Sequence, residues 1–487
     1  MAVPYLKETS VQEWLAVPES VRWLPAMATA SAAGLPKDWS SFWTTHASAL
    51  FESGRSGRWT VLIPDLEMTT GINAAQPQQA LAELAHWQQQ NPGARLAGWP
   101  EFQGGLILLI SYDLVRAYEP ISAQAKDDLG TLPIIAGFAR EVLVYDHQEK
   151  SVTAIVLGDR LVAPSLEELH EACLGRARKL LAKWLACPRQ SEKAPVHPQA
   201  SQPALSRLAP VATFDEVSFC SAVRRVQEYI AAGDTYQVNL SLRQSFPLTV
   251  DPEQIYETLR RINPSPYMGL LRTPGLTLVS GSPELLVRTC GDRLESRPIA
   301  GTRPRGNDPA ADLALLQELL ANEKERAEHL MLVDLLRNDL GRVARRGSVG
   351  VDEFMTVESY SHVMHLVSHI SGHLETMPAI DDVLRAVFPG GTITGAPKVR
   401  TMQIIEELEP VRRGYYTGAF GWLGLDGSLN LNIIIRSLIA QNGVGHIQAG
   451  AGIVADSDPA REYRESLNKA LALVRALEET KYERRLA

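Results

Sequence analysis

A segment with few residues that can form a core divides the chain into two parts. Residues 188–211 are rich in proline, serine, glutamine and alanine, whereas the sequence on either side contains regular apolar patterns. Such a composition is typical of a linker or of a long crossing over the surface. We therefore predict an amino-terminal domain over residues 1–187, a linker over residues 188–211 and a second domain over residues 212–481. A chain of 487 residues is long enough for several domains of ordinary size.

Charge and composition argue against several classes of partner. The chain has 45% hydrophobic residues and a net charge of -8, which argues against binding to nucleic acid or to an anionic membrane surface. The first residues lack a basic region followed by an apolar run, so we expect no secretory signal. The most apolar stretch, residues 105–112, is too short to span a bilayer and suits a buried strand. We expect a cytoplasmic protein with no nucleic-acid and no membrane partner.

The second part of the chain mixes helices and strands in an irregular order. Several consecutive strands near its end are separated by glycine turns, which favours antiparallel pairing over regular alternation of strands and helices. This pattern predicts an α+β fold. Apolar spacing predicts strands at 235–246, 269–273, 277–289, 359–373, 417–424, 429–440 and 446–454, and helices at 253–262, 309–336, 379–387, 397–408 and 459–479.

Two pairs of glutamates lie in predicted helices, Glu325 with Glu328 and Glu462 with Glu465. The i,i+3 spacing places both carboxylates of a pair on one helical face, which also carries apolar residues. If the two faces meet inside the fold, a cation is needed to make so much buried negative charge tolerable. On exposed helices the same spacing is ordinary. Lys469, four residues after Glu465, fits either an ion pair or a ligand contact.

Four histidines, His362, His365, His369 and His373, lie within residues 357–374. On a helix three of them would share a face and suggest a zinc site. The β-branched residues between them favour a strand instead, in which His362 points away from His365 and His369. Spacing therefore argues against a zinc site and does not single out one histidine.

Three glycine-rich segments can bring backbone close to a ligand. Residues 388–398 begin like a phosphate loop but lack its lysine, so we expect no nucleotide, although the exposed N–H groups can hold a carboxylate. Residues 298–306 contain two arginines and fit a basic surface turn. The small residues of 448–454 allow close approach of a ligand or of a neighbouring strand.

Together these segments resemble the chorismate-utilising enzymes. They occur in the order of that family and span residues 213–480, while residues 51–59 and 102–113 resemble the amino-terminal half of its ammonia-using members. The resemblance implies large, mostly antiparallel sheets packed as a sandwich with helices outside. The matching segments are GDTYQVNLS (233–241), GSPELL (281–286), PIAGTRPRG (298–306), ERAEHLMLVDLLRNDLGRV (325–343), YSHVMHLVS (360–368), FPGGTITGAPK (388–398), LNIIIRS (431–437), QAGAGIVADS (448–457) and EYRESLNKA (462–470).

The resemblance implies a magnesium ion between the protein and the ring carboxylate of chorismate. Glu328 and Glu465 match the direct ligands. Glu325 and Glu462 match residues that act through water, which suits the tendency of magnesium to keep part of its hydration shell.

Roles for other side chains follow from the same resemblance. Glu284 matches the general acid that protonates the departing C4 hydroxyl, a task that needs a pKa raised by burial. His365 matches the active-site histidine, and Tyr416 and Arg436 match the pair that holds the enolpyruvyl carboxylate. The remaining substrate contacts implied are Thr302, Thr392, Gly452 and Lys469.

One position distinguishes reactions within the family. Where isochorismate-forming members have a lysine that activates water, this chain has Gln237, which cannot act as a base. Ammonia is nucleophilic when neutral and is therefore the expected attacking group. None of the four cysteines lies in the context of an amidotransferase nucleophile, so we expect a separate glutamine amidotransferase subunit to supply ammonia.

The ammonia-using members form two products, and the motifs here are most similar to aminodeoxychorismate synthases of the Bacillus-like type. We therefore expect 4-amino-4-deoxychorismate, for 4-aminobenzoate and folate synthesis. Ala300 replaces a lysine of many such enzymes and is also found in anthranilate synthases, so anthranilate is the alternative product. A tryptophan-binding regulatory relative without activity is a third reading. In the family, segments like 51–53 and 263–268 can hold tryptophan, although an ordinary core contact fits these residues equally well.

Overall fold

A computed structural model describes residues 5–43, 47–53, 57–162, 165–189, 210–306, 308–359 and 363–486. Most of the predicted linker, residues 190–209, lies outside the described residues, as does His362. Across the described ranges, every helix is too short or too polar to cross a membrane.

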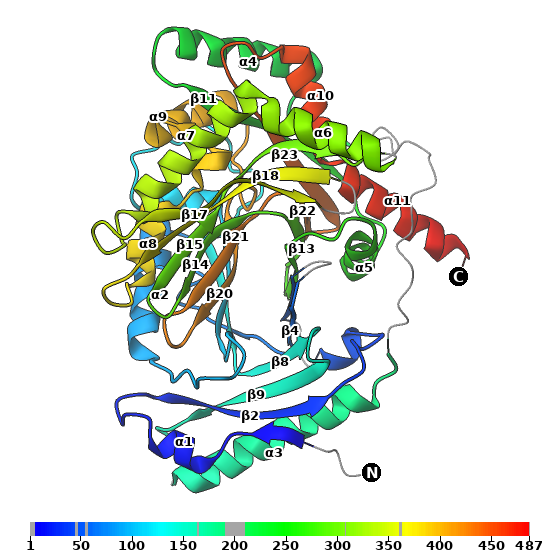
Figure 1. Cartoon of the computed structure of the whole chain (residues 1–487). Coiled ribbons are helices and arrows are strands. Elements are labelled where there is room, and N and C mark those ends of the chain that lie inside the picture. Colours follow the sequence, from blue (N-terminus) through cyan, green and yellow to red (C-terminus); the bar gives the residue numbers. More distant parts are fainter. Residues whose placement is uncertain are drawn as a thin grey trace.

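Two antiparallel sheets form the centre of the molecule (Figure 1). The first is a 13-stranded sheet. Side chains along each strand point alternately to its two faces, and one or both of these faces are buried. Its strand order is β1 (Tyr5–Glu8), β2 (Trp23–Ser31), β9 (Ser151–Asp159), β8 (Glu141–Asp146), β4 (Trp59–Ile63), β3 (Ser48–Glu52), β12 (Tyr267–Thr273), β13 (Leu276–Ser282), β22 (Ser437–Gln441), β23 (Val444–Ile453), β11 (Gln237–Pro247) and β10 (Val211–Ala212), with β19 (Gly395–Ala396) beside β11.

The second is a 10-stranded sheet that holds the predicted buried strand of residues 105–112 as β6. Its order is β16 (Ile299–Pro304), β18 (Val363–His373), β15 (Arg293–Arg297), β14 (Leu285–Cys290), β21 (Leu429–Ile433), β20 (Ala419–Gly424), β6 (Gly105–Ile110), β7 (Ile134–Ala139) and β5 (Glu67–Met68), with β17 (Gly350–Ser359) beside β18. Strands from both sides of residues 190–209 pair in each sheet, as β3 does with β12 and β6 with β20.

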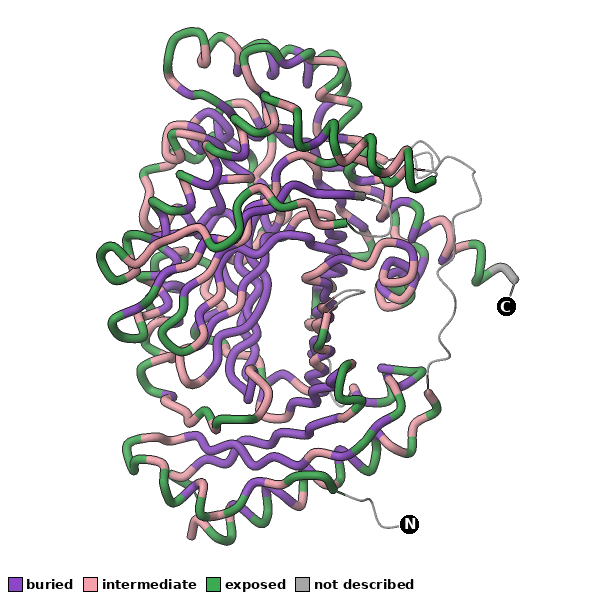
Figure 2. The backbone as a smooth tube through the Cα atoms, in the orientation of Figure 1, coloured by how far each residue is buried: buried purple, intermediate pink, exposed green. Residues whose placement is uncertain are grey.

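The two sheets pack face to face over an apolar core. The Phe51 ring on β3 stacks on Phe420 of β20 with 4.7 Å between ring centroids, and Phe102 packs on Trp422 of β20. Figure 2 shows the central strands buried along most of their length. Burial of these apolar side chains is the main stabilising contribution at the centre of the fold. The predicted α+β sandwich is confirmed.

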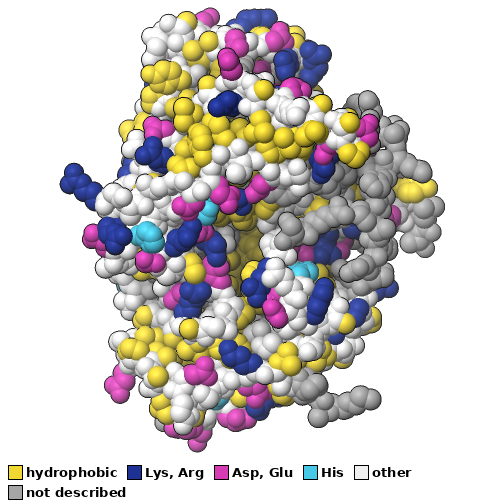
Figure 3. Space-filling view, viewed as in Figure 1, with side chains coloured by type: hydrophobic (Ala, Val, Ile, Leu, Met, Phe, Trp, Pro, Cys, Tyr) yellow, Lys and Arg dark blue, Asp and Glu magenta, His cyan; other side chains and the backbone are white. Residues whose placement is uncertain are grey.

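Helices cover the outer surfaces of the sandwich (Figure 1). The long α3 (Leu166–Ala186) packs on β2 and β9, α5 (Pro252–Ile262) and α11 (Leu471–Leu486) pack on each other, and α10 (Pro459–Lys469) packs on β23. Apolar side chains also gather on the surface over α6 (Pro309–Ala321), where Leu313 and Leu320 are exposed (Figure 3). The other described helices are α1 (Val11–Leu15), α2 (Pro77–Gln90), α4 (Glu216–Ala231), α7 (Glu323–Leu340), α8 (Ile380–Val387) and α9 (Lys398–Leu408).

Several predicted elements are interrupted in the structure. The helix expected over 309–336 is two helices, because Asn322 caps α7 by accepting a hydrogen bond from the backbone N–H of Glu325 at 3.0 Å. The helix expected over 459–479 likewise ends at Lys469 before α11 begins. Residues 298–306, interpreted as a surface turn, contain strand β16.

Two predicted strands are also divided, and each division has the same cause. The strand expected over 277–289 is β13 in the 13-stranded sheet followed by β14 in the 10-stranded sheet. The strand expected over 429–440 is β21 and then β22, which belong to opposite sheets in the reverse order. At each place the chain crosses from one layer of the sandwich to the other, although its apolar pattern continues.

Candidate active site

The two crossings between the sheets place Glu284 and Arg436 in one region. Glu284 lies between β13 and β14, and Arg436 lies between β21 and β22. The Ile433 N–H donates to the Glu284 carbonyl at 3.1 Å, and the Gly281 N–H donates to the Arg436 carbonyl at 3.1 Å. Arg436 has a φ of 50°, an uncommon backbone conformation for a residue with a side chain. Such strain persists only where the surroundings hold it, and it concentrates at functional sites.

The Glu284 carboxyl is in a state suited to giving up a proton near neutral pH. Its side chain is buried, and this burial raises its pKa to about 7. The Thr392 hydroxyl, the Ile299 backbone and the Arg436 charge act in the opposite direction without cancelling the effect of burial. A carboxyl with this pKa is populated in both forms at pH 7 and fits a general acid.

Arg436 is a desolvated cation without a matching anion in the described protein. Desolvation lowers its pKa, and Glu284 is the one described carboxyl that opposes this shift. No acidic side chain among the described residues forms an ion pair with its guanidinium. Because leaving a desolvated charge unpaired is costly, the position fits an anionic ligand.

His365 and Thr302 face each other across neighbouring strands. They are directly opposite in the pairing of β18 with β16, and the Thr302 hydroxyl lies 2.8 Å from His365 Nδ1. Burial and the nearby Arg436 charge lower the His365 pKa to about 3, so the imidazole is neutral at pH 7. Since Arg436 acts on both His365 and Glu284, these three predicted site residues are brought together. His369 and His373, on the same strand, lie near acidic residues instead.

Gln237, Glu328 and Gly452 form a second part of the site, at the start of β11 and the end of β23. Gln237 Nε2 donates to Glu328 Oε1 at 2.9 Å. A Cβ atom added to Gly452 would lie 2.4 Å from Gln237 Nε2 and 3.6 Å from Glu328 Oε1. A side chain at this position would therefore displace Gln237, which explains why residue 452 is a glycine.

The Tyr416 ring is largely buried, and its centre lies 5.7 Å from the Arg413 guanidinium. Burial raises its pKa to about 12, so the phenol stays protonated and can donate a hydrogen bond to a ligand. The next residue, Thr417, is β-branched and has a φ of 61°, a strained conformation for such a side chain.

Glu325 on α7 and Glu465 on α10 differ in their surroundings. Glu325 pairs with Arg303 at 2.6 Å through Oε1, while its Oε2 is buried without a hydrogen-bond partner. A Cβ added to Gly301 would lie 2.4 Å from that oxygen. Glu465 is exposed and pairs with Lys469 at 3.1 Å, and Lys469 also donates to the Gly450 carbonyl at 3.0 Å.

Within the described ranges, no three His, Cys, Asp or Glu side chains are close enough together to hold one metal ion. The structure therefore does not gather the two glutamate pairs, and the magnesium site stays a prediction. The donors do suit magnesium, because carboxylate oxygens are its usual protein ligands and the Glu325 Oε2 atom has no hydrogen-bond partner.

The two segments of the predicted tryptophan pocket are neighbours in the structure. Glu52 on β3 pairs in register with Met268 on β12. The Glu52 carboxylate accepts hydrogen bonds from Arg260 Nε at 2.8 Å and from the Tyr256 hydroxyl at 2.7 Å. The buried charge is thus matched by groups of the protein, and tryptophan binding stays a prediction.

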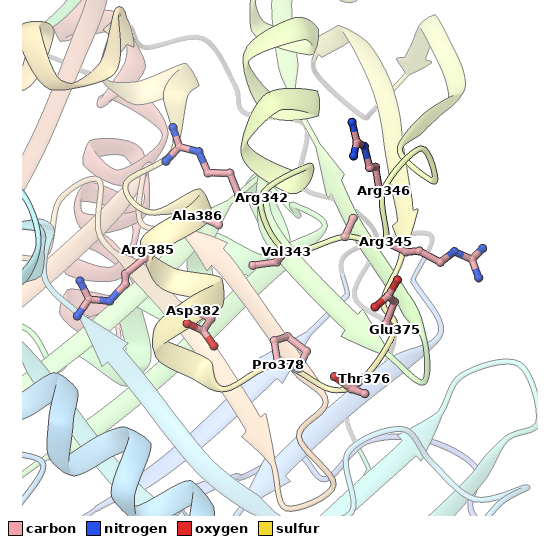
Figure 4. Close-up of a pocket in the computed structure, with 11 residues that line it drawn as sticks. Arg342, Val343, Arg345, Arg346, Glu375, Thr376, Pro378, Asp382, Arg385 and Ala386 are labelled. Carbon is pink, nitrogen blue, oxygen red and sulfur yellow. The ribbon is translucent and has the colours of Figure 1, made fainter.

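A cavity of about 620 Å³ lies elsewhere, between residues 342–346, which follow α7, and residues 375–386, which include most of α8. It is lined by Arg342, Arg345, Arg346 and Arg385 among others, and Figure 4 shows these arginines extending away from one another. None of the predicted site residues lines this cavity. The arrangement does not converge on a ligand.

The structure adds three residues that the sequence analysis missed. Arg303 pairs with Glu325, and Asn239 and Arg413 contact the segments that carry Gln237, Thr392 and Tyr416. Arg303 lies in residues 298–306, which the sequence pattern indicated to be a surface turn, so it was not predicted as a site residue. The alternation of strand β11 does place Asn239 on the same face as Gln237, which was the one available signal.

Comparison with known proteins identifies relatives along most of the chain. The family described as chorismate binding enzyme matches residues 46–475. Aminodeoxychorismate synthase component 1 of Bacillus subtilis is 45% identical over 454 residues, 90% of this chain and 93% of the relative. Anthranilate synthase component 1 of Thermus thermophilus is 46% identical over 408 residues, 84% of each chain. The crystal structure of anthranilate synthase component I from Streptococcus pneumoniae is 29% identical with a TM-score of 0.68, covering 96% of this chain and 97% of that one.

Proposed function

Since the chain belongs to the chorismate-binding enzymes, we propose that it catalyses the amination of chorismate by ammonia to give 4-amino-4-deoxychorismate. One observation carries this proposal: a buried carboxyl with a pKa of about 7, Glu284, lies near a desolvated arginine that has no acidic partner among the described residues. This pair provides a proton donor next to a binding position for an anion. The similarity to the Bacillus subtilis aminodeoxychorismate synthase component supports the choice of product.

Substrate binding requires cations, because chorismate is a dianion and the chain has a net charge of -8. Arg436 and the protonated phenol of Tyr416 are suited to hold the enolpyruvyl carboxylate through charge-assisted and neutral hydrogen bonds. Lys469 lies on the helix that packs on β23, donates to the Gly450 carbonyl and offers a further positive charge. Thr302 and Thr392 supply hydroxyl groups near His365 and Glu284 respectively.

The chemical step replaces the C4 hydroxyl by an amino group. Ammonia forms the new C–N bond, the C–O bond breaks, and Glu284 protonates the departing hydroxyl so that it leaves as water. The proton that ammonia loses restores the acid, so the reaction consumes chorismate and ammonia and releases the aminated product and water. Neutral His365 fits hydrogen bonding to the substrate better than proton donation at pH 7.

Ammonia is the proposed nucleophile because Gln237 cannot deprotonate water. Its side chain is an amide that donates a hydrogen bond to Glu328 and is not itself a base. We propose that ammonia comes from a separate glutamine amidotransferase subunit, as the sequence analysis predicts.

Magnesium is the proposed cofactor, with Glu328 and Glu465 as direct ligands and Glu325 and Glu462 acting through water. When bound, the ion would neutralise the carboxylates and hold the ring carboxylate of chorismate.

Anthranilate is a second candidate product, and two observations favour it. Ala300 lies buried on β16, so no lysine is available there for covalent attack on the ring. The anthranilate synthase component of Thermus thermophilus is about as similar to this chain as the Bacillus subtilis protein is.

A product assay tests the proposal directly. We expect the purified chain, with chorismate, ammonium and magnesium, to form a product that yields 4-aminobenzoate only after addition of 4-amino-4-deoxychorismate lyase. Anthranilate formed without the lyase would replace this product assignment with the second candidate. Absence of any chorismate consumption would refute both and support the inactive regulatory relative.

Arg436→Met is expected to weaken chorismate binding at least tenfold, because a charge-assisted hydrogen bond to a carboxylate is lost. The same change is expected to leave the melting temperature of the free protein unchanged or higher, since it removes a desolvated cation that has no acidic partner among the described residues. Isothermal titration calorimetry and thermal melting measure the two effects.

Arg260→Met is the matched control for this variant. Arg260 is also largely buried, but it pairs with Glu52, so its removal leaves a buried carboxylate unmatched. We expect this control to lower the melting temperature. An unchanged affinity in Arg436→Met, or a loss of stability equal to that of the control, would contradict the assigned role.

A further inference from the structure

A buried ion pair connects the segments of the site from the protein interior. The side chains of Arg413 and Glu409 are 1% and 3% exposed, and their closest charged atoms are 2.8 Å apart. Glu409 is the C-cap residue of α9, and its Oε1 also accepts hydrogen bonds from the Ser241 N–H at 2.9 Å and from the Ser241 hydroxyl at 2.8 Å. The carboxylate therefore links the end of α9 to β11.

The Arg413 guanidinium has five N–H groups, and each has an acceptor. The Nε–H group and one N–H group of Nη2 donate to the Glu409 carboxylate at 3.0 and 2.8 Å. The second Nη2 hydrogen donates to the Asn239 carbonyl at 2.6 Å. Nη1 donates to the Ile393 carbonyl at 2.9 Å and to the Thr417 hydroxyl at 3.3 Å.

The three acceptors other than Glu409 belong to three segments that each carry a predicted site residue. Asn239 is two residues from Gln237 on β11, Ile393 follows Thr392 in the turn of Gly391–Ile393, and Thr417 follows Tyr416. The guanidinium also lies 5.7 Å from the centre of the Tyr416 ring.

The same segments are tied to one another around this residue. The Asn239 amide donates to the Ile393 carbonyl at 3.1 Å, and the Asn239 N–H donates to the Thr394 carbonyl at 2.8 Å. Thr417 has a strained φ of 61°, and its hydroxyl is one of the Arg413 acceptors. Arg413 thus supports a backbone conformation that the chain would not adopt alone.

A buried ion pair by itself is weak evidence for a contribution to stability, because apolar residues of similar size often replace one without loss. Three of the five N–H groups of Arg413 donate to oxygen atoms of segments of the site, which indicates a different role. We propose that Arg413 is a positioning residue of the chorismate site, which holds Thr392 and Tyr416 in register with Gln237 through the oxygen atoms of Ile393, Thr417 and Asn239. This inference rests on the proposed function.

Arg413→Lys tests the proposal, because lysine keeps the charge but has three donors in place of five. We expect kcat/KM for chorismate to fall about 100-fold, the order of loss that a shift of about 1 Å in a substrate-holding group causes. We expect KM to rise and kcat to fall, because both Tyr416 and Thr392 move. A merely structural role would reduce the folded fraction, which lowers kcat and leaves KM unchanged.

Arg116→Lys is the matched control. Arg116 is a partly buried arginine that pairs with Glu406 on α9 at 2.6 Å, one helical turn from Glu409. Its other acceptors are Asp113 and the carbonyls of Ile121 and Ser122, none of which is a predicted site residue. We expect this variant to lose stability while its KM for chorismate stays that of the unchanged chain.

Hydrogen exchange followed by mass spectrometry gives a readout that does not need turnover. We expect Arg413→Lys to speed exchange in peptides covering 235–246, 389–400 and 415–420, and the control to leave these peptides unchanged. Unchanged exchange there, or an unchanged KM and kcat, would overturn the inference. If the unchanged chain does not consume chorismate, the proposed function fails, whereas the exchange pattern still shows whether Arg413 orders these segments.

Discussion

Glu284→Gln is expected to reduce kcat for chorismate about 10²–10⁴-fold, because glutamine cannot protonate the departing hydroxyl. In the proposed step Glu284 acts in its protonated form, so activity of the unchanged chain is expected to fall as pH rises through about 7, the pKa of this buried carboxyl. The variant should lack that decline in its residual activity. Rates measured between pH 5.5 and 9 test both statements.

The same carboxyl is expected to make the folded chain less stable as pH rises, whereas an ordinary ion-paired acid makes it more stable. Its pKa is raised from 4.5 to about 7 in the folded chain, so the folded state binds the proton more tightly. Its contribution to stability is complete below pH 4.5 and is lost as pH rises through about 7. The melting temperature of Glu284→Gln relative to the unchanged chain should therefore be higher at pH 8 than at pH 5.

Glu406→Gln is the control, because Glu406 is equally buried but pairs with Arg116 outside the site. We expect it to keep the decline of activity near pH 7. A Glu284→Gln variant with near-normal kcat, or with an unaltered pH profile, would exclude Glu284 as the acid.

Glu328→Gln is expected to abolish turnover while leaving the fold intact. Its amide oxygen can still accept the hydrogen bond from Gln237, which lies at 2.9 Å, so the change removes the charge and keeps the local packing. In the proposed site Glu328 is a direct ligand, and its replacement would remove a charge that holds magnesium. Turnover at saturating magnesium, and calorimetric titration with magnesium in the absence of chorismate, measure the effect.

Glu323→Gln provides the comparison on the same helix, since Glu323 is exposed in the first turn of α7. We expect this variant to bind magnesium and to turn over chorismate like the unchanged chain. Near-normal activity in Glu328→Gln would remove the metal assignment, and equal losses in both variants would attribute the effect to the helix as a whole. Glu465→Gln is expected to behave like Glu328→Gln, although its present partner is Lys469.

Local patterns in the sequence were sufficient for most element types. The apolar run of residues 105–110 is a buried strand, and the helices expected at 253–262, 379–387 and 397–408 agree with α5, α8 and α9 to within one residue at each end. Such elements are specified by the period of their apolar residues and by nearby caps, which are properties of neighbouring residues.

The interruptions were not predictable in the same way. The strands expected over 277–289 and 429–440 have continuous apolar patterns, yet each crosses between the two sheets at the position of Glu284 or Arg436. A crossing is decided by which partner strands each half finds, and those partners lie far away along the chain. The Ser282 hydroxyl, for example, donates to the Ile433 carbonyl 151 residues later.

The sequence by itself determined the chemical groups, the element types and the family resemblance, because these depend on residue identity and local spacing. Only the tertiary structure decided that Glu284 is buried with a pKa of about 7, that Arg436 has no acidic partner within the described chain, and that Arg413 joins three segments of the site. Burial and electrostatic surroundings are properties of groups brought together from distant parts of the chain. For this protein, the two crossings between the sheets bring those groups together.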